Sequence, residues 1–102
     1  MWTTRGSTRL ISHRLEPSMR TFKIPDALED TYRGAGAGLA ASVDGELVAI
    51  VYIDDIIPNF SGEIADLPNA VLDPMVVPTV RYLQTVGKVH VGMMSGWTFT
   101  EL

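Results

Sequence analysis

The chain contains no cysteine in its 102 residues. Disulfide bonds, thiolate nucleophiles, thiol redox switches and thiolate metal sites are therefore all excluded. The N-terminal region also lacks an apolar segment of about 7 to 15 residues followed by a small-residue cleavage site, which a secretory signal requires. Together these two absences predict a cytoplasmic protein.

Long apolar runs are absent as well. The longest, residues 47–53, is far shorter than the roughly 20 residues that a membrane-spanning helix needs. Apolar residues still make up 46% of the chain and charged residues 20%, which are ordinary values for a globular protein. The sequence therefore predicts a folded domain without a membrane partner.

Positive charge is scarce. Eight Lys and Arg stand against twelve Asp and Glu, which gives a formal net charge of −4. Residues 1–18 hold three arginines and one glutamate, so residues 19–102 hold five basic and eleven acidic side chains. An acidic body repels the phosphates that nucleic-acid binders neutralise with Lys and Arg, so we expect no nucleic-acid partner.

Known catalytic and cofactor motifs are missing too. The glycine-rich segment 34–38 shares only its composition with phosphate-binding loops, because Leu39 stands where a dinucleotide loop needs its last glycine. We interpret the segment as a flexible connector. No nucleophile-elbow, zinc or calcium-loop pattern occurs, so the sequence predicts no cofactor and no metal site.

Residues 1–18 differ in composition from the rest of the chain. They are rich in Ser, Thr and Arg and show neither a strand nor a helix period in their apolar residues. We interpret them as a flexible basic arm, and leave open whether translation starts at Met1 or at Met19. Residues 19–102 are enough for a single globular domain and too few for two.

The strongest local pattern is a β-hairpin over about 39–53. Asp44-Gly45 suits a two-residue type I′ turn, in which both central residues take positive φ. The second strand is apolar on both faces, so it needs cover on both. The cross-strand pairs expected from this turn are Val43 with Glu46, Ala41 with Val48, and Leu39 with Ile50.

A second hairpin is expected over about 89–101, turning at Ser95-Gly96, with Trp97 and Phe99 facing the core. The N-terminal half of the domain should contain a short strand at 20–24. A two-turn helix at 27–33, capped by Asp26, should follow it.

Residues 79–86 fit a helix that starts near Pro78 and ends before Gly87. The predicted fold is therefore α+β, a small antiparallel sheet with two hairpins packed by one or two short helices. The alternative is a mainly β fold in which 79–86 is a strand, because several of its residues favour strands.

No residue is predicted to be catalytic, but three are candidates. Asp54 and Asp55 close the apolar strand, where an acidic pair can bind metal or act as a base. Adjacent strand residues point to opposite faces, so we do not expect both to serve one site. His90 is the one histidine in 19–102, and histidine is the most frequent general acid or base near neutral pH.

Two further groups of residues are expected to mediate binding. Met and aromatic side chains at the C-terminal end of the chain suit an adaptable ligand pocket, and apolar residues among the prolines of 54–78 suit a dimer interface. The predicted pocket residues are Tyr82, His90, Met93, Met94 and Trp97. The predicted interface residues are Ile56, Ile57, Phe60, Val76 and Val77.

These patterns favour a non-enzymatic homo-oligomeric module, most simply a dimer, that binds a small molecule or a protein partner. One alternative is a small hydrolase or isomerase that uses His90 with Asp54 or Asp55. Another is an antitoxin-like or inhibitor protein that wraps a partner with its basic arm.

Overall fold

The computed structural model describes residues 19–58, 60 and 67–102. The predicted arm, 1–18, lies outside the described residues. The elements in chain order are β1 (Met19–Thr21), η3 (Asp26–Leu28), β2 (Ala37–Val43), β3 (Glu46–Tyr52), η4 (Ile53–Asp55), α1 (Leu67–Ala70), α2 (Val77–Val86), β4 (Lys88–Met93) and β5 (Thr98–Glu101).

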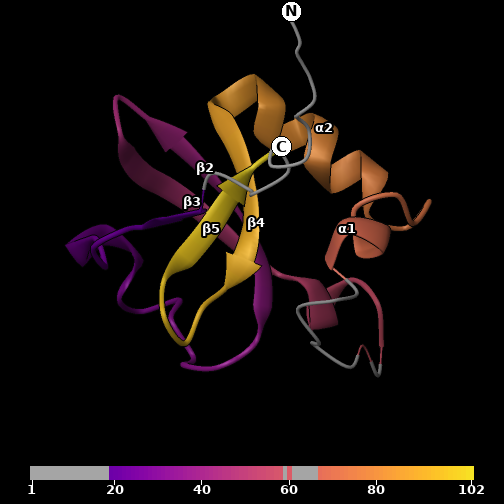
Figure 1. The fold of residues 1–102 in the computed structure, drawn as a ribbon, viewed down its shortest axis with the longest axis horizontal. Coiled ribbons are helices and arrows are strands. Elements are labelled where there is room, and N and C mark those ends of the chain that lie inside the picture. Colours follow the sequence, from indigo (N-terminus) through magenta and orange to yellow (C-terminus); the bar gives the residue numbers. More distant parts are fainter. Residues whose placement is uncertain (1–18, 59, 61–66) are drawn as a thin grey trace, which may run out of the picture.

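The strands form one antiparallel five-stranded sheet in the order β1-β5-β4-β2-β3, and α2 lies along one side of it (Figure 1). The predicted α+β fold with two hairpins is therefore confirmed. The helix predicted at 79–86 is confirmed as well, because α2 spans Val77–Val86 and has Pro78 in its first turn, where a missing N–H costs no hydrogen bond. The strand alternative for this segment, and with it the mainly β fold, is wrong.

The first hairpin turns where the sequence predicts. Asp44 and Gly45 have φ angles of 53° and 83°, which a type I′ turn requires, and Val43 pairs with Glu46. Beyond the turn the register shifts, because Val48 is an extra residue on β3. The predicted pairs of Ala41 with Val48 and Leu39 with Ile50 are therefore wrong, and the observed partners are Ala49 and Val51.

The bulge at Val48 has a packing reason. Strict alternation from Leu47 would place residues 47, 49 and 51 on one face of the sheet. With one extra residue, Leu47 shares a face with Ile50 and Tyr52, and all three are buried in the same core. Burial of the larger side chains thus decides the register that the turn alone does not fix.

The second hairpin joins β4 to β5 and pairs Met93 with Thr98 across the predicted Ser95-Gly96 turn. Trp97 adopts a positive φ of 51° as the chain leaves this turn. Trp97 and Phe99 are both buried, as expected from the sequence.

The N-terminal half departs from its predicted elements. The strand is β1, three residues long, instead of 20–24, and the two-turn helix at 27–33 is reduced to η3 and the turn that follows. Asp26 makes no side-chain capping bond. The helix does not extend because the Arg33 backbone N–H donates to the Tyr52 hydroxyl at 2.6 Å instead of to a carbonyl one helical turn earlier.

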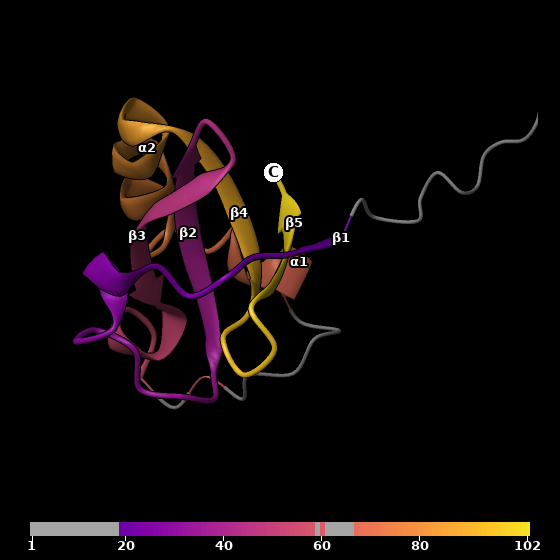
Figure 2. The same cartoon turned by 90° about the vertical axis from the view of Figure 1, so that its left-hand side faces the viewer.

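Both faces of the sheet carry a hydrophobic core. We call the core under α2 the helix-side core, and the core on the opposite face, where the N-terminal residues 19–25 cross the sheet, the strap-side core. The helix-side core lies under α2 and contains Ala37, Leu39, Ala41, Ile53, Ala70, Val76, Leu83, Val89 and Val91. The strap-side core contains Phe22, Leu28, Ala40, Leu47, Ile50, Tyr52, Met94, Trp97 and Phe99. Its cover is the segment that follows β1, which crosses the strands on the face opposite α2 (Figure 2). On β3 the strap side is buried at Leu47, Ile50 and Tyr52, whereas Val48 is 45% exposed and Ala49 and Val51 are half-buried, so cover on both faces is only partly observed.

Replacing Gly45 with Val should lower the free energy of unfolding by at least about 1 kcal/mol, because a β-branched residue resists positive φ. Urea unfolding monitored by circular dichroism measures the loss. Asp44→Asn is the control, since Asn tolerates the same backbone region and should leave the transition nearly unchanged. An unchanged transition for Gly45→Val would contradict the assigned turn.

Candidate functional site

The five residues predicted to line a ligand pocket are divided between the two sides of the sheet. Tyr82 lies on α2 and is 66% exposed, and Met93 packs against the helix-side core. His90, Met94 and Trp97 are buried on the opposite side. The division follows from strand alternation along β4, so these residues do not surround one cavity.

The predicted interface residues pack largely against their own chain. Val76 is fully buried in the helix-side core, and Ile56, Ile57 and Phe60 pack against that core. Val77 is half-buried at the start of α2. A polar substitution at one of these positions would therefore disturb the fold of a single chain before it reported on association.

Asp54 and Asp55 are brought together, against the expectation that they would point apart. The strand ends at Tyr52, and both carboxylates lie in the 3₁₀ turn η4. The Arg33 guanidinium bonds Asp54 at 3.2 Å and Asp55 at 3.1 and 3.2 Å. The same guanidinium lies 3.9 Å from the centroid of the Tyr52 ring. This cluster ties the loop before β2 to the end of β3.

His90 lies on the other side of the sheet from α2 and is only 4% exposed. Its Nε2 shares a 2.8 Å hydrogen bond with the Ser42 hydroxyl, and the Phe22 ring packs edge-on at 5.2 Å between centroids. Burial lowers the pKa of His90 below its ordinary value of 6.5, because it disfavours the charged imidazolium. The neutral ring is therefore the form that the fold stabilises.

The predicted pairing of His90 with Asp54 or Asp55 is not what the geometry brings together. The carboxylate that acts on the imidazole is Glu101, its register partner on β5. Asp54 and Asp55 instead pair with Arg33.

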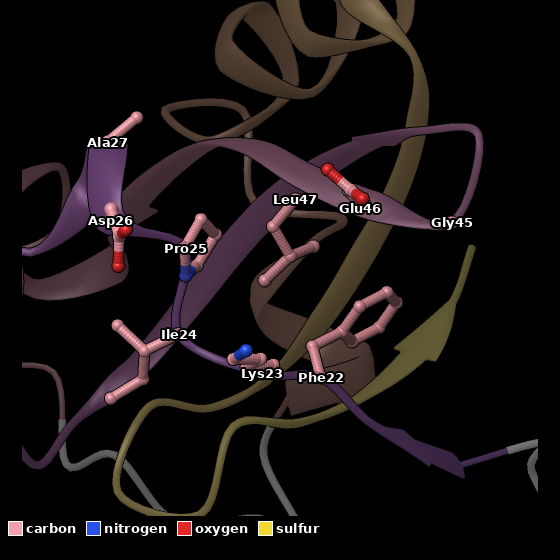
Figure 3. A pocket seen from close by; sticks show the side chains of 9 residues that line it. All are labelled: Phe22, Lys23, Ile24, Pro25, Asp26, Ala27, Gly45, Glu46 and Leu47. Atoms are coloured by element: carbon pink, nitrogen blue, oxygen red, sulfur yellow. The ribbon is translucent and has the colours of Figure 1, made fainter.

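A pocket of about 440 Å³ lies where the N-terminal segment crosses the first hairpin (Figure 3). We call residues 19–25 the strap and this cavity the strap pocket. Its lining consists of Phe22, Lys23, Ile24, Pro25, Asp26, Ala27, Gly45, Glu46 and Leu47. The sequence does not indicate this pocket, because its residues come from two segments about twenty positions apart that carry no shared motif.

The strap pairs with β5 through β1, and further contacts of Arg20 and Phe22 fix it over the sheet. The Phe22 backbone N–H donates to the Trp97 carbonyl at 2.8 Å. Arg20 donates from Nη2 to the Gly45 carbonyl at 3.2 Å, and its guanidinium lies 4.5 Å from the centroid of the Phe22 ring. Since Phe22 and Gly45 both line the strap pocket, these contacts also shape the cavity.

The strap pocket combines apolar and charged groups. Phe22 and Leu47 are buried side chains that form its inner surface, while Lys23, Asp26 and Glu46 are exposed. Among the described residues, no histidine or nucleophilic hydroxyl lines the cavity. Across the described ranges, no group of three or more His, Asp or Glu side chains is placed to hold a metal ion. The chemistry on offer is apolar contact with charge at the rim, which suits binding.

The chain matches no known protein-family model, and a search of curated proteins finds no relative. Among the helices of the described residues, none is long and apolar enough to cross a membrane.

The free energy of unfolding should fall as the pH drops below about 6.5. The unfolded chain binds a proton at His90 near that value, whereas the folded chain resists the proton until a lower pH, so acid favours unfolding. Urea unfolding between about pH 5 and pH 8 measures the slope. His90→Asn should reduce the slope of the free energy of unfolding against pH. The other histidine, His13, is present in both proteins and therefore does not account for a difference between them. An equal slope in the variant would rule out His90 as its source.

Proposed function

We propose that this protein is a non-enzymatic binding module that holds a small organic molecule with an apolar body in the strap pocket. The observation that carries the proposal is the cavity itself. Its volume of about 440 Å³ lies within the roughly 300 to 1,000 Å³ typical of small-molecule sites. The buried Phe22 and Leu47 offer the ligand an apolar surface, and the charged rim can orient a polar group.

The placement of the candidate catalytic groups favours binding over proton transfer. His90 is covered by Phe22 and bonded to a hydroxyl, and it does not line the strap pocket. Asp54 and Asp55 are engaged by Arg33. A general acid or base must lie within hydrogen-bonding reach of the bound substrate, and none of these three groups lines the cavity.

A thermal-shift screen of small metabolites with apolar bodies tests this function. A ligand specific to the folded state stabilises it by about 2.7 kcal/mol at a hundredfold excess over its Kd, which raises the melting temperature by several degrees. The blocking variant is Ala27→Phe, since Ala27 is exposed and lines the strap pocket. We expect a hit to shift the unmodified protein and to leave Ala27→Phe unshifted.

The matched control is Ala35→Phe, the same substitution at an exposed alanine that does not line the strap pocket. A hit should shift this variant as much as the unmodified protein. A screen without hits, or hits that also shift Ala27→Phe, would overturn the proposed function.

We also propose that the module forms a homodimer through the exposed side of α2. Large apolar side chains are exposed on α2 and in the turn before it: Tyr82 on α2 is 66% exposed, and Leu72 and Met75, which precede α2, are 74% and 57% exposed. Arg81 is the only charged residue of α2, so two copies can approach without a cluster of like charges. Exposed apolar surface of this kind often marks an interface, and a two-fold dimer is its commonest form.

Light scattering at micromolar concentration should report about twice the chain mass of 11.2 kDa. Tyr82→Glu should shift the population toward the monomer, because it places a carboxylate in the apolar contact. Gln84→Glu adds the same charge at another exposed position of α2 and should leave the dimer intact. A monomer for the unmodified chain would refute self-association and would leave the proposed ligand binding in the strap pocket unaffected.

A further inference from the structure

Phe22 belongs to two environments at once. One part of its ring packs on His90 at 5.2 Å between centroids, and the side chain also lines the strap pocket. The strap therefore covers the buried imidazole with the same residue that shapes the cavity. Any movement of the strap that admitted water to His90 would also change the pocket.

We propose that protonation of His90 releases the strap and thereby dismantles the strap pocket, so that the bound molecule is held near neutral pH and released in mild acid. This inference rests on the proposed function for its ligand, but the opening of the strap can be measured without one. His90 is 4% exposed, and the Phe22 ring of the strap packs against it at 5.2 Å between centroids.

The charged side chains around His90 do not offset the effect of burial on its cationic form. Glu101 on β5 favours the imidazolium, whereas Arg20 on β1 and Lys88 on β4 disfavour it. Burial is the largest influence, and it lowers the pKa. The remaining neighbour, Ser42 on β2, is a neutral hydroxyl. A proton on His90 therefore creates a buried cation without a compensating anion of equal effect.

Of the two covers of the sheet, the strap is the one that can open. Ser42 and His90 are the only buried polar residues in the described part of the chain, and both lie on the strap side. The buried Nε1 of Trp97, in the same core, has no hydrogen-bond partner among the residues that the structure describes. The helix-side core, by contrast, is built from apolar residues alone. The strap is also short, since β1 has three residues, all exposed.

Release of the strap would remove two parts of the strap pocket together. Phe22 would leave its inner surface, and Arg20 would lose the Gly45 carbonyl that it bonds at 3.2 Å. The sheet itself would keep its β2, β3 and β4 pairings, because the strap pairs only with β5. The opening is therefore local, and a measurement can separate it from unfolding.

The absence of native cysteine allows a direct test in the full chain. Leu47→Cys places a thiol in the strap pocket, and Leu83→Cys places one under α2; the native side chains are 3% and 1% exposed. The rate of reaction with 4,4′-dithiodipyridine is measured for each and divided by the rate of free cysteine at the same pH. Cys reactivity at position 47 should rise by up to about tenfold for each pH unit below 6.5, while position 83 stays protected.

Adding His90→Asn to Leu47→Cys should abolish the rise. Equal increases at positions 47 and 83 would mean global unfolding, and a rise that survives His90→Asn would mean another trigger; either result overturns the proposal. Should the Leu47→Cys variant fail to fold, hydrogen exchange of the Phe22 amide, bonded to the Trp97 carbonyl, is compared with that of Val80 in α2 in the unmodified chain. The protection factor of the Phe22 amide should be lower at about pH 5 than at about pH 7.5, while that of Val80 stays the same. A Phe22 protection factor that is equal at the two pH values would refute the opening.

The two proposals fail separately. A pH-dependent strap with no hit in the ligand screen would leave the opening valid and overturn the binding function. A hit that binds equally well at about pH 5 and pH 7.5 would leave the binding function valid and overturn its control by His90.

Discussion

Burial of both faces of the two central strands is the constraint on which the rest of the structure depends. β2 and β4 pair along their length, and their small residues let layers approach from each side. Gly38 and Gly92 face each other in the register, and a Cβ at Gly38 would collide with Met94, while one at Gly92 would collide with the Thr98 carbonyl. These two glycines therefore admit the C-terminal hairpin to the strap-side core.

The two covers differ in kind. The helix-side face is closed by α2, whose backbone hydrogen bonds are satisfied within the helix and whose Leu83 and neighbours fill the core. The strap-side face is closed by irregular chain with a three-residue strand and a single 3₁₀ turn. An irregular cover packs less completely and opens more easily than a regular one. The strap pocket and the buried His90 both lie under this weaker cover.

Local chemistry explains which features the sequence could predict. Asp44-Gly45 specifies its turn by backbone preference, and Pro78 with Leu83 specifies α2, because each signal acts over a few residues. The features that the sequence could not predict depend on distant partners. The bulge at Val48 follows from the need to bury Leu47 with Ile50, and the early end of the helix after η3 follows from the bond between Arg33 and the Tyr52 hydroxyl.

The surroundings of His90 and the strap pocket could not be predicted for the same reason, because they also depend on residues that are distant in the chain. Alternation along β4 correctly separates His90 from Val89 and Val91, but it does not show that Ser42 would supply the hydrogen bond or that Phe22 would cover the ring. Those neighbours come from β2 and from the strap, 48 residues away in the case of Ser42. A helix over this face would have filled the space that the strap leaves open. Under this short cover Phe22 both packs against His90 and lines the cavity, so a change that moves Phe22 affects the two together.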